Sequence, residues 1–187
     1  MPPKVKITKS DIINAAVEVV RRQGSAALNA RTVAGHLNCS TQPIFSNYHS
    51  MEELKADVIR AAETLHQQFI RQETERGKYP PYKASGIAYV RFAKEERELF
   101  KLLFMRDRSG EKMQDSTEET EALIGIIRKN TGMTKEDACL FHLGMWVYVH
   151  GIATMVATSY LEWDWELISK MLTDAYEGMK LRYAKKG

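Results

Sequence analysis

Short side chains that can donate and accept hydrogen bonds are concentrated in one stretch near the N-terminus. They are Thr41, Gln42, Ser46 and Asn47, with Pro43 among them. At helical spacing these side chains share an outer face, and apolar residues fall on the opposite one. Such groups match the donors and acceptors on base edges in the major groove of DNA, and a small apolar ring fits thymine methyl groups. An ordinary solvated helix face is the alternative.

Neighbouring residues add groups suited to guanine and to phosphates. Arg31 carries a guanidinium that matches the O6 and N7 atoms of guanine. Phosphate contacts position a protein on DNA without reading its sequence. The residues predicted to make them are Thr32, Tyr48, His49 and the lysines between positions 4 and 9. Tyr48 is also spaced i, i+4 from Ile44, so packing in the core is the alternative for it.

Two short helices joined by a turn are needed to present these residues. Asn29 is typical of a helix N-cap, and Asn38 can enter the left-handed conformation that ends a helix. Ser40 is expected to cap the second helix, and Pro43 falls in its first turn, where a missing N–H leaves no bond unmade. The stretch 29–51 is therefore predicted to be a helix-turn-helix.

Charge is unevenly distributed along the chain. The whole sequence has 27 Lys and Arg and 24 Asp and Glu, a net charge of +3. Six of those basic and two of those acidic residues lie in the first 50 positions, which leaves 21 and 22 for the rest. A polyanionic partner for the N-terminal end is one interpretation. A chance asymmetry is the other.

The composition is typical of a soluble globular protein, with 44% hydrophobic and 27% charged residues. The start of the chain lacks the apolar segment of a secretory signal. The apolar stretch 138–161 is interrupted by His142 and His150, which favours a buried helix over a membrane span. Cys39 and Cys139 are too few for a disulfide framework. We expect a cytoplasmic protein that does not associate with membranes.

Helical periodicity continues to the end of the chain, and no alternating segment predicts a strand. The capping-box sequence Ser50-x-x-Glu53 is expected to begin a long helix. The sequence therefore predicts an all-α fold of about nine helices. The predicted segments after the helix-turn-helix are 50–76, 82–105 with an interruption at 94–98, 116–130, 135–160 and a last helix after Asp164; a first helix is predicted from Thr8 or Ser10 to about Gln23.

Residues 31–48, followed by Ser50-Met51-Glu52-Glu53-Leu54, resemble the TetR family of bacterial transcriptional regulators. A weaker resemblance covers 98–104 and the Trp-x-x-x-His-Gly pattern at 146–151, which is similar to the C-terminal region of one TetR subgroup. The chain departs from the family pattern at Asn38, where glycine is common, and at Met51, where a lysine often meets a phosphate. His49 or a helix-terminal amide is expected to substitute for that lysine.

The resemblance implies an N-terminal three-helix helix-turn-helix domain, residues 1–49 with the start of helix four to about 60. It implies a C-terminal bundle, residues 50–187, that binds ligand and forms a homodimer through the last two helices. The implied function is a repressor released from a palindromic double-stranded DNA operator by a small-molecule effector. The long fourth helix is the expected lever between the two domains.

Bulky residues of the C-terminal part are expected to line an apolar effector pocket. A packed core is the alternative for each of them, and His150 is also typical of a core histidine. The candidates are Tyr89, Phe92, Phe100, Phe104, Met105, Met145, Tyr148, His150 and Met155.

The sequence predicts no catalytic set, cofactor or metal. Cys139 and His142 are three positions apart without further ligands, and nothing around Cys39 favours a reactive thiolate. No Ser/His/Asp set, paired carboxylates or phosphate-binding loop supports an enzyme. The alternatives are an all-α small-molecule-binding enzyme and an architectural DNA-binding protein without an effector.

Overall fold

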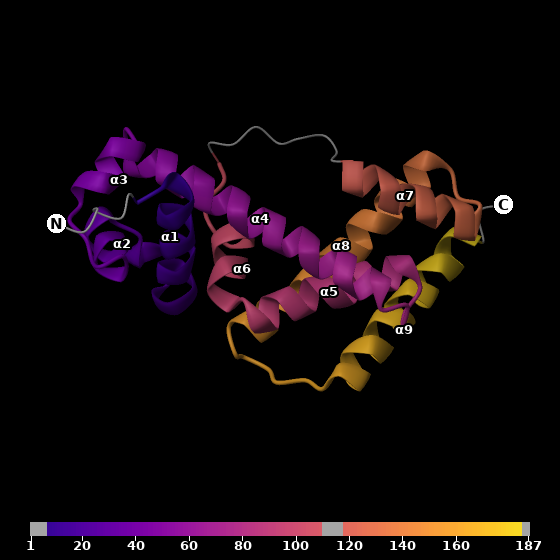
Figure 1. Cartoon of the computed structure of the whole chain (residues 1–187). Coiled ribbons are helices and arrows are strands. Elements are labelled where there is room, and N and C mark those ends of the chain that lie inside the picture. The colour runs from indigo at the N-terminus through magenta and orange to yellow at the C-terminus, as the bar shows by residue number, and fades with distance from the viewer. Residues whose placement is uncertain (1–6, 110–117, 185–187) are drawn as a thin grey trace. The chain divides into compact units, whose positions relative to one another are not determined.

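The structure, a computed structural model, describes residues 7–109 and 118–184. Over those residues it has nine α-helices, one 3-10 turn and no strand, which confirms the all-α prediction (Figure 1). Lys4 and Lys6 lie outside the described residues, as do the first two positions of the helix predicted at 116–130. The helices are α1 Lys9–Gln23, α2 Ala30–His36, α3 Gln42–Asn47, α4 Met51–Glu75, α5 Pro81–Glu95, α6 Arg97–Phe104, α7 Glu118–Thr131, α8 Lys135–Ala157 and α9 Trp165–Ala184, with the 3-10 turn η1 at Ser25–Ala27.

The chain forms two compact units. Unit 1 comprises residues 1–67 and 96–106, and unit 2 comprises residues 68–95 and 107–187. Helix α4 is continuous and contributes residues to both units. Helix α6 belongs to unit 1, although the residues before and after it belong to unit 2.

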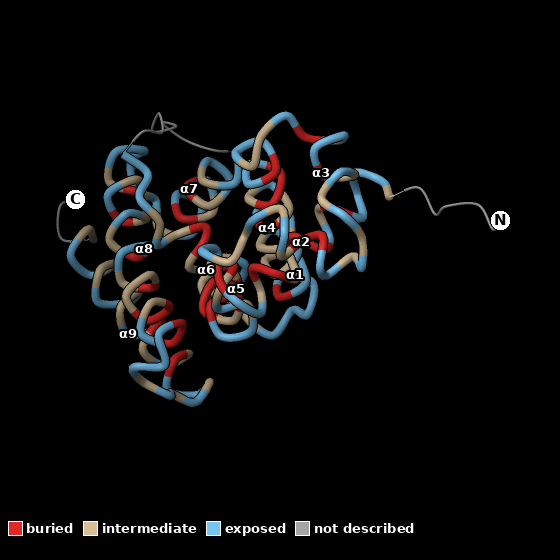
Figure 2. The backbone as a smooth tube through the Cα atoms, turned by 90° about the vertical axis from the view of Figure 1, so that its left-hand side faces the viewer, coloured by how far each residue is buried: buried red, intermediate tan, exposed pale blue. Residues whose placement is uncertain are grey.

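The core of unit 1 is built from one apolar side of each N-terminal helix. Ile12 and Val20 of α1, Val33 of α2, Ile44 of α3 and Leu54 of α4 are fully buried. The i, i+3, i+4 spacing on α1 places its apolar side chains on one face, which packs inward. This core holds α2 and α3 and leaves their other sides exposed, as the pale blue segments of Figure 2 show.

Local signals set the ends of α1. Thr8 and Asp11 form a capping box, with the Asp11 amide donating to Thr8 Oγ1 (3.2 Å) and the Thr8 amide donating to Asp11 Oδ2 (2.8 Å). These hydrogen bonds from Thr8 hold the pKa of the Asp11 carboxyl below its usual range. Gly24, at φ 79°, ends the helix after Gln23, which is the predicted end, because that left-handed backbone region favours glycine.

An ion pair between distant residues joins α6 to α1. The guanidinium of Arg21 donates from Nε and Nη2 to the two carboxylate oxygens of Glu96 (2.7 and 3.0 Å). The Glu96 carboxylate raises the pKa of Arg21 further. A Cβ at Gly24 would lie 2.9 Å from Glu98 Oε2, so the end of α1 and the start of α6 approach closely. These contacts explain why α6 belongs to unit 1.

Helix α8 has a buried side and an exposed apolar side within unit 2. Phe141 and Met145 pack with Ile124 and Ile127 of α7 in a core cluster. Leu140, Leu143, Trp146 and Val147 are large apolar residues that the single chain leaves exposed. By length and composition α8 could cross a membrane, with a mean hydropathy of 1.4, and a core helix of a soluble protein passes the same test.

Of the two ends that flank the α8–α9 connection, one differs from the sequence-based expectation and one agrees with it. Helix α8 ends at Ala157 and not near residue 160, because Ser159 adopts a positive φ of 56° that a right-handed helix cannot contain. Helix α9 begins after Asp164, whose Oδ1 accepts from the Leu167 amide (2.7 Å) as expected of an N-cap.

Candidate nucleic-acid interface

The N-cap of α2 places Arg31 and Thr32 at the start of the helix-turn-helix. Asn29 Oδ1 accepts from the amides of Arg31 (3.0 Å) and Thr32 (3.1 Å), which confirms the predicted cap. The Thr32 hydroxyl donates to the carbonyl of Ala27 (2.5 Å) and accepts from the Asn29 amide (3.2 Å). Thr32 is therefore engaged in capping, whereas it was expected to contact a phosphate.

The Arg31 side chain is exposed, and within the described part of the chain no carboxylate pairs with it. Its counterparts Arg21, Arg60 and Arg91 all hold ion pairs. A guanidinium without an internal partner keeps all its donors for an external acceptor. The structure thus leaves Arg31 available at the edge of α2.

The turn between α2 and α3 is set by Asn38. Its φ of 50° is left-handed, as predicted, and the Cys39 amide donates to the carbonyl of Ala34 (3.0 Å) across it. The prediction that Ser40 caps α3 is wrong. The N-cap residue is Thr41, which has helical φ and ψ of −71° and −14° and makes no side-chain capping bond. Pro43 lies in the first turn as predicted.

Helix α3 has a buried side that anchors it and an outer side that the described part of the chain leaves exposed. Ile44 is fully buried, while Gln42 and Ser46 are exposed. The Ser46 hydroxyl donates to the Gln42 carbonyl (2.9 Å), and Asn47 Nδ2 donates to the Pro43 carbonyl (2.8 Å). Asn47 keeps its carbonyl oxygen and its second N–H hydrogen for other partners. Thr41, Pro43 and Asn47 are half-buried.

Phe45 is a residue of this face that the sequence interpretation missed. It is 56% exposed in the middle of α3, between the exposed side chains of Gln42 and Ser46. An exposed phenyl ring is unfavourable in water and is one of the apolar groups that contact thymine methyl groups in the major groove. The available signal was its position three residues after Gln42, because residues i and i+3 of a helix share a face.

Phe45→Ala is expected to weaken specific DNA binding by about 1–2 kcal/mol through lost apolar contact and to leave stability within about 0.5 kcal/mol of the parent. Replacing single thymines of the bound duplex with uracil removes the methyl group that Phe45 is proposed to contact, so the same contact is lost on the DNA side. At the contacted thymine, uracil should weaken DNA binding by the parent protein and leave DNA binding by Phe45→Ala unchanged. Equal sensitivity of both proteins at every thymine would exclude this contact.

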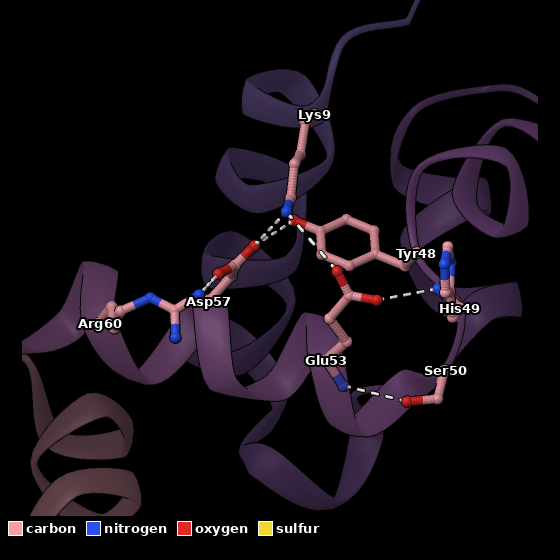
Figure 3. A network of polar contacts seen from close by, with 7 residues as sticks. All are labelled: Lys9, Tyr48, His49, Ser50, Glu53, Asp57 and Arg60. Carbon is pink, nitrogen blue, oxygen red and sulfur yellow. Dashed lines mark hydrogen bonds and ion pairs between the residues drawn. The ribbon is translucent and has the colours of Figure 1, made fainter.

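Tyr48 lies in the core of unit 1, which is the alternative to its predicted phosphate contact. It is 1% exposed, and its hydroxyl donates to Asp57 Oδ2 of α4 (2.9 Å; Figure 3). Lys9 Nζ lies 4.7 Å from the centre of the Tyr48 ring. Burial, together with the nearby Glu53 charge, raises the pKa of the Tyr48 hydroxyl, which therefore remains a donor. A contact with DNA would require this arrangement to open.

The start of α4 is held by a variant of the predicted capping box. The Glu53 amide donates to Ser50 Oγ (3.2 Å), as expected. The Glu53 carboxylate, however, accepts from the His49 amide (2.9 Å) and not from that of Ser50 (Figure 3). This backbone hydrogen bond lowers the pKa of Glu53. The His49 amide is thus occupied, while the His49 side chain is exposed and Met51 is half-buried.

The expected effector-pocket residues fall in two different units. Phe100, Phe104 and Met105 belong to unit 1, where the Phe104 ring lies 5.4 Å from that of His66. Burial lowers the pKa of His66 to about 4. Six belong to unit 2: Tyr89, Phe92 and Met145 are buried, Tyr148 and His150 are half-buried, and Met155 is exposed.

Two tyrosine–histidine pairs join α5 to α8 in unit 2. The Tyr89 hydroxyl lies 2.9 Å from His150 Nδ1, and the Tyr82 hydroxyl lies 3.0 Å from His142 Nδ1. The exposed Trp146 ring stacks on His150, with centroids 5.4 Å apart. Burial raises the pKa of both tyrosines and lowers that of both histidines, which favours the neutral forms. The structure therefore gives unit 2 two partly buried polar pairs among aromatic side chains.

No three His, Cys, Asp or Glu side chains lie together as metal ligands within residues 7–109 and 118–184. Cys39 and Cys139 are free thiols and are half-buried. The features that stand out chemically are thus the outer side of α3 with Arg31 in unit 1 and the aromatic interior of unit 2.

A family model described as tetracyclin repressor-like, C-terminal domain, matches residues 82–175. The match spans half of the chain and covers helices that belong mainly to unit 2. No match to the chain was found among curated proteins. An all-α chain with this C-terminal match belongs to the TetR family, and it is a regulator of the TetR type. Membership implies DNA binding and dimerisation in general terms.

Proposed function

We propose that this chain is a ligand-responsive DNA-binding transcriptional repressor that reads its operator with α3 and Arg31. The observation that carries the proposal is the outer side of α3, where Gln42, Phe45 and Ser46 are exposed while Ile44 anchors the helix. These side chains provide hydrogen-bonding groups and one apolar group, which is what base edges in the major groove require. Arg31 supplies a group suited to guanine.

DNA reading is assigned to residues 1–49 with the start of α4, and effector binding and dimerisation to residues 50–187. The helix-turn-helix, its Asn29 cap and its Asn38 turn all lie in the first segment. Helix α6 is an exception within the second segment, because it packs in unit 1. A segment of the effector-binding part that packs against α1 offers a route by which the effector could act on DNA binding.

The proposed partner in assembly is a second copy of the chain, joined through α8 and α9. Leu140, Leu143, Trp146 and Val147 form an exposed apolar stripe on α8 that a second copy would cover. In a two-fold dimer the two α3 helices contact half-sites of one palindromic duplex, about 34–36 Å apart on successive major grooves. The operator is accordingly double-stranded and two-fold symmetric.

The proposed effector is a small molecule bound in unit 2. Tyr89, Phe92 and Tyr148 provide aromatic surface, and the Tyr89–His150 pair provides polar atoms for orientation. The effector can release DNA only if it binds the DNA-free state more tightly than the DNA-bound state. Helix α4, which contributes to both units, is the proposed lever.

The direct test is fluorescence anisotropy with DNA from upstream of the protein's own gene and a shuffled duplex of equal length. Affinity for both duplexes should fall steeply with salt, by at least about 100-fold between about 50 and about 200 mM, because lysines and arginines displace counterions from phosphates. The upstream duplex should bind more tightly than the shuffled one at every salt concentration. An affinity for both duplexes that does not change with salt concentration would exclude DNA as the partner.

The other two functions give different results in the same assay. An architectural protein would bind the upstream and shuffled duplexes equally, and no small molecule would release it. An enzyme would convert candidate ligands during incubation, which product analysis detects. Release of the upstream duplex by a hydrophobic or cationic compound that is recovered unchanged supports the repressor.

A further inference from the structure

A buried carboxylate lies where three elements of unit 1 meet. Asp57 of α4 is 7% exposed. It accepts a hydrogen bond from the Tyr48 hydroxyl (2.9 Å), pairs with Lys9 Nζ (3.1 Å) and pairs with Arg60 (Figure 3). Lys9 is the first residue of α1, and Tyr48 is the C-cap of α3. One side chain therefore connects the start of α1, the end of α3 and the second turn of α4.

Helix α3 depends on this connection because it has few anchors of its own. It comprises six residues, and its N-cap makes no side-chain hydrogen bond. A helix this short is not stable by itself. Its inward side chains are Ile44, which is held only by apolar packing, and Tyr48, which is held by packing and by the directed bond to Asp57. The Tyr48 bond therefore fixes the rotation and the C-terminal end of α3.

The buried charge of Asp57 is compensated by Lys9 and Arg60, which suits a role in positioning α3 more than a role in stability. A buried carboxylate without partners would be strongly destabilising, and buried ion pairs contribute little net stability over well-packed apolar residues. Lys9 also lies 3.8 Å from Glu53, which in turn accepts from the His49 amide. The network continues from Asp57 through Lys9 and Glu53 to His49, the second residue after α3. The connection between α3 and α4 is therefore tied to α4 at both Tyr48 and His49.

We propose that Asp57 is a positioning residue, which through Tyr48 and Lys9 holds α3 at the angle on α4 that base reading requires. This inference rests on the proposed function. Base contacts need side chains placed to within about 0.5 Å, whereas attraction to phosphates depends mainly on charge. Loss of the Asp57 contacts should therefore reduce specific binding and spare binding to unrelated DNA.

The test measures the ratio of specific to nonspecific affinity for Asp57→Asn and Tyr48→Phe. Asp57→Asn keeps the shape and removes the charge that holds Lys9 and Arg60, while Tyr48→Phe removes only the hydroxyl. Each should lower the ratio about tenfold, the value of one hydrogen bond to a charged group. The double variant should lose little more than either single variant, because both act through one contact. Affinity is measured at a temperature where circular dichroism shows each variant to be folded.

Glu52→Gln is the matched control. Glu52 is an exposed carboxylate in the first turn of α4, and no ion pair or hydrogen bond joins it to the Asp57 network. Its loss changes the charge of the same region and should raise both affinities slightly, so the ratio stays constant. If Asp57 acted only through its charge, Asp57→Asn would likewise raise both the specific and the nonspecific affinity.

Three results would overturn the positioning role. The first is a ratio of specific to nonspecific affinity that is the same for Asp57→Asn as for Glu52→Gln. The second is an equal loss of specific and nonspecific affinity in Asp57→Asn. The third applies if Asp57→Asn does not fold: a ratio in folded Tyr48→Phe that equals that of the parent would then overturn the positioning role. Failure of the proposed function is distinguishable, because the parent protein itself would then show no preference between the duplexes.

Discussion

Val147→Glu together with Leu143→Glu is expected to convert the protein from a dimer to a monomer. Both residues lie on the exposed apolar stripe of α8 and are 58% and 53% exposed in the single chain. In a two-fold interface each substitution occurs twice. Burying unpaired carboxylates against apolar side chains costs several kcal/mol, so the dissociation constant of the dimer should rise at least about 1,000-fold.

The measurement is sedimentation equilibrium, in which the parent should show twice the chain mass of 21.4 kDa and the variant the chain mass itself. Asn130→Glu is the matched control, because it adds one carboxylate at an exposed position of α7 away from the stripe. Circular dichroism should show both variants to be as helical as the parent. A variant that remains dimeric would place the interface elsewhere. The monomer should also lose operator affinity, since it contacts only one half-site.

Arg31→Ala is expected to weaken binding to the specific duplex by about 1–3 kcal/mol, the value of one bidentate contact with guanine. The reason is structural: Arg31 is exposed, and its guanidinium has no carboxylate partner in the described part of the chain. Base preference should relax at one position in each half-site. Stability should change by less than about 0.5 kcal/mol.

Arg31→Lys separates base reading from phosphate attraction. Lysine keeps the charge and loses the planar fork that pairs with O6 and N7, so the variant should bind unrelated DNA like the parent and still lose specificity. Arg128→Ala on α7 is the control for loss of an exposed arginine in unit 2. If Arg31 contacts only a phosphate, Arg31→Ala will weaken all duplexes equally and reduce the salt slope by about one.

The parts of the fold that follow from neighbouring residues were predictable. Asn29, Thr134 and Asp164 cap helices through amides two or three positions ahead, and Asn38 ends α2 by its own backbone conformation. These contacts depend on a few consecutive residues, whose types are visible in the sequence. The same locality explains why the all-α class and most helix ends were predicted.

The parts that depend on distant residues were not predictable. The Arg21–Glu96 pair spans 75 positions and places α6 in unit 1, which periodicity cannot reveal. Tyr48 was a candidate both for a phosphate contact and for the core, and the acceptor of its hydroxyl in the core is Asp57, nine positions ahead. Glu53 could accept from two neighbouring amides, and the geometry of the turn selects that of His49.

The residues of α2 and α3 that are proposed to contact bases were predicted from their types, and the structure shows which of them are exposed. Gln42, Ser46 and Arg31 are exposed, as a reading face requires, while Thr32 is engaged in capping α2. Phe45 was overlooked because apolar residues are expected inside, and its 56% exposure shows that it belongs to the outer side of α3. Exposure depends on how α3 rotates against the core, which the sequence of a six-residue helix does not define.

The most direct test of the account is selection of bound duplexes from a random-sequence pool by the purified full-length chain. The account predicts enrichment of a two-fold symmetric motif, whose half-sites lie about 10 base pairs apart or a multiple of that distance. Selection with Arg31→Ala should yield the same motif with one symmetric pair of positions relaxed. A pool that remains random after repeated selection, or a motif without symmetry, would contradict a dimeric, sequence-reading regulator.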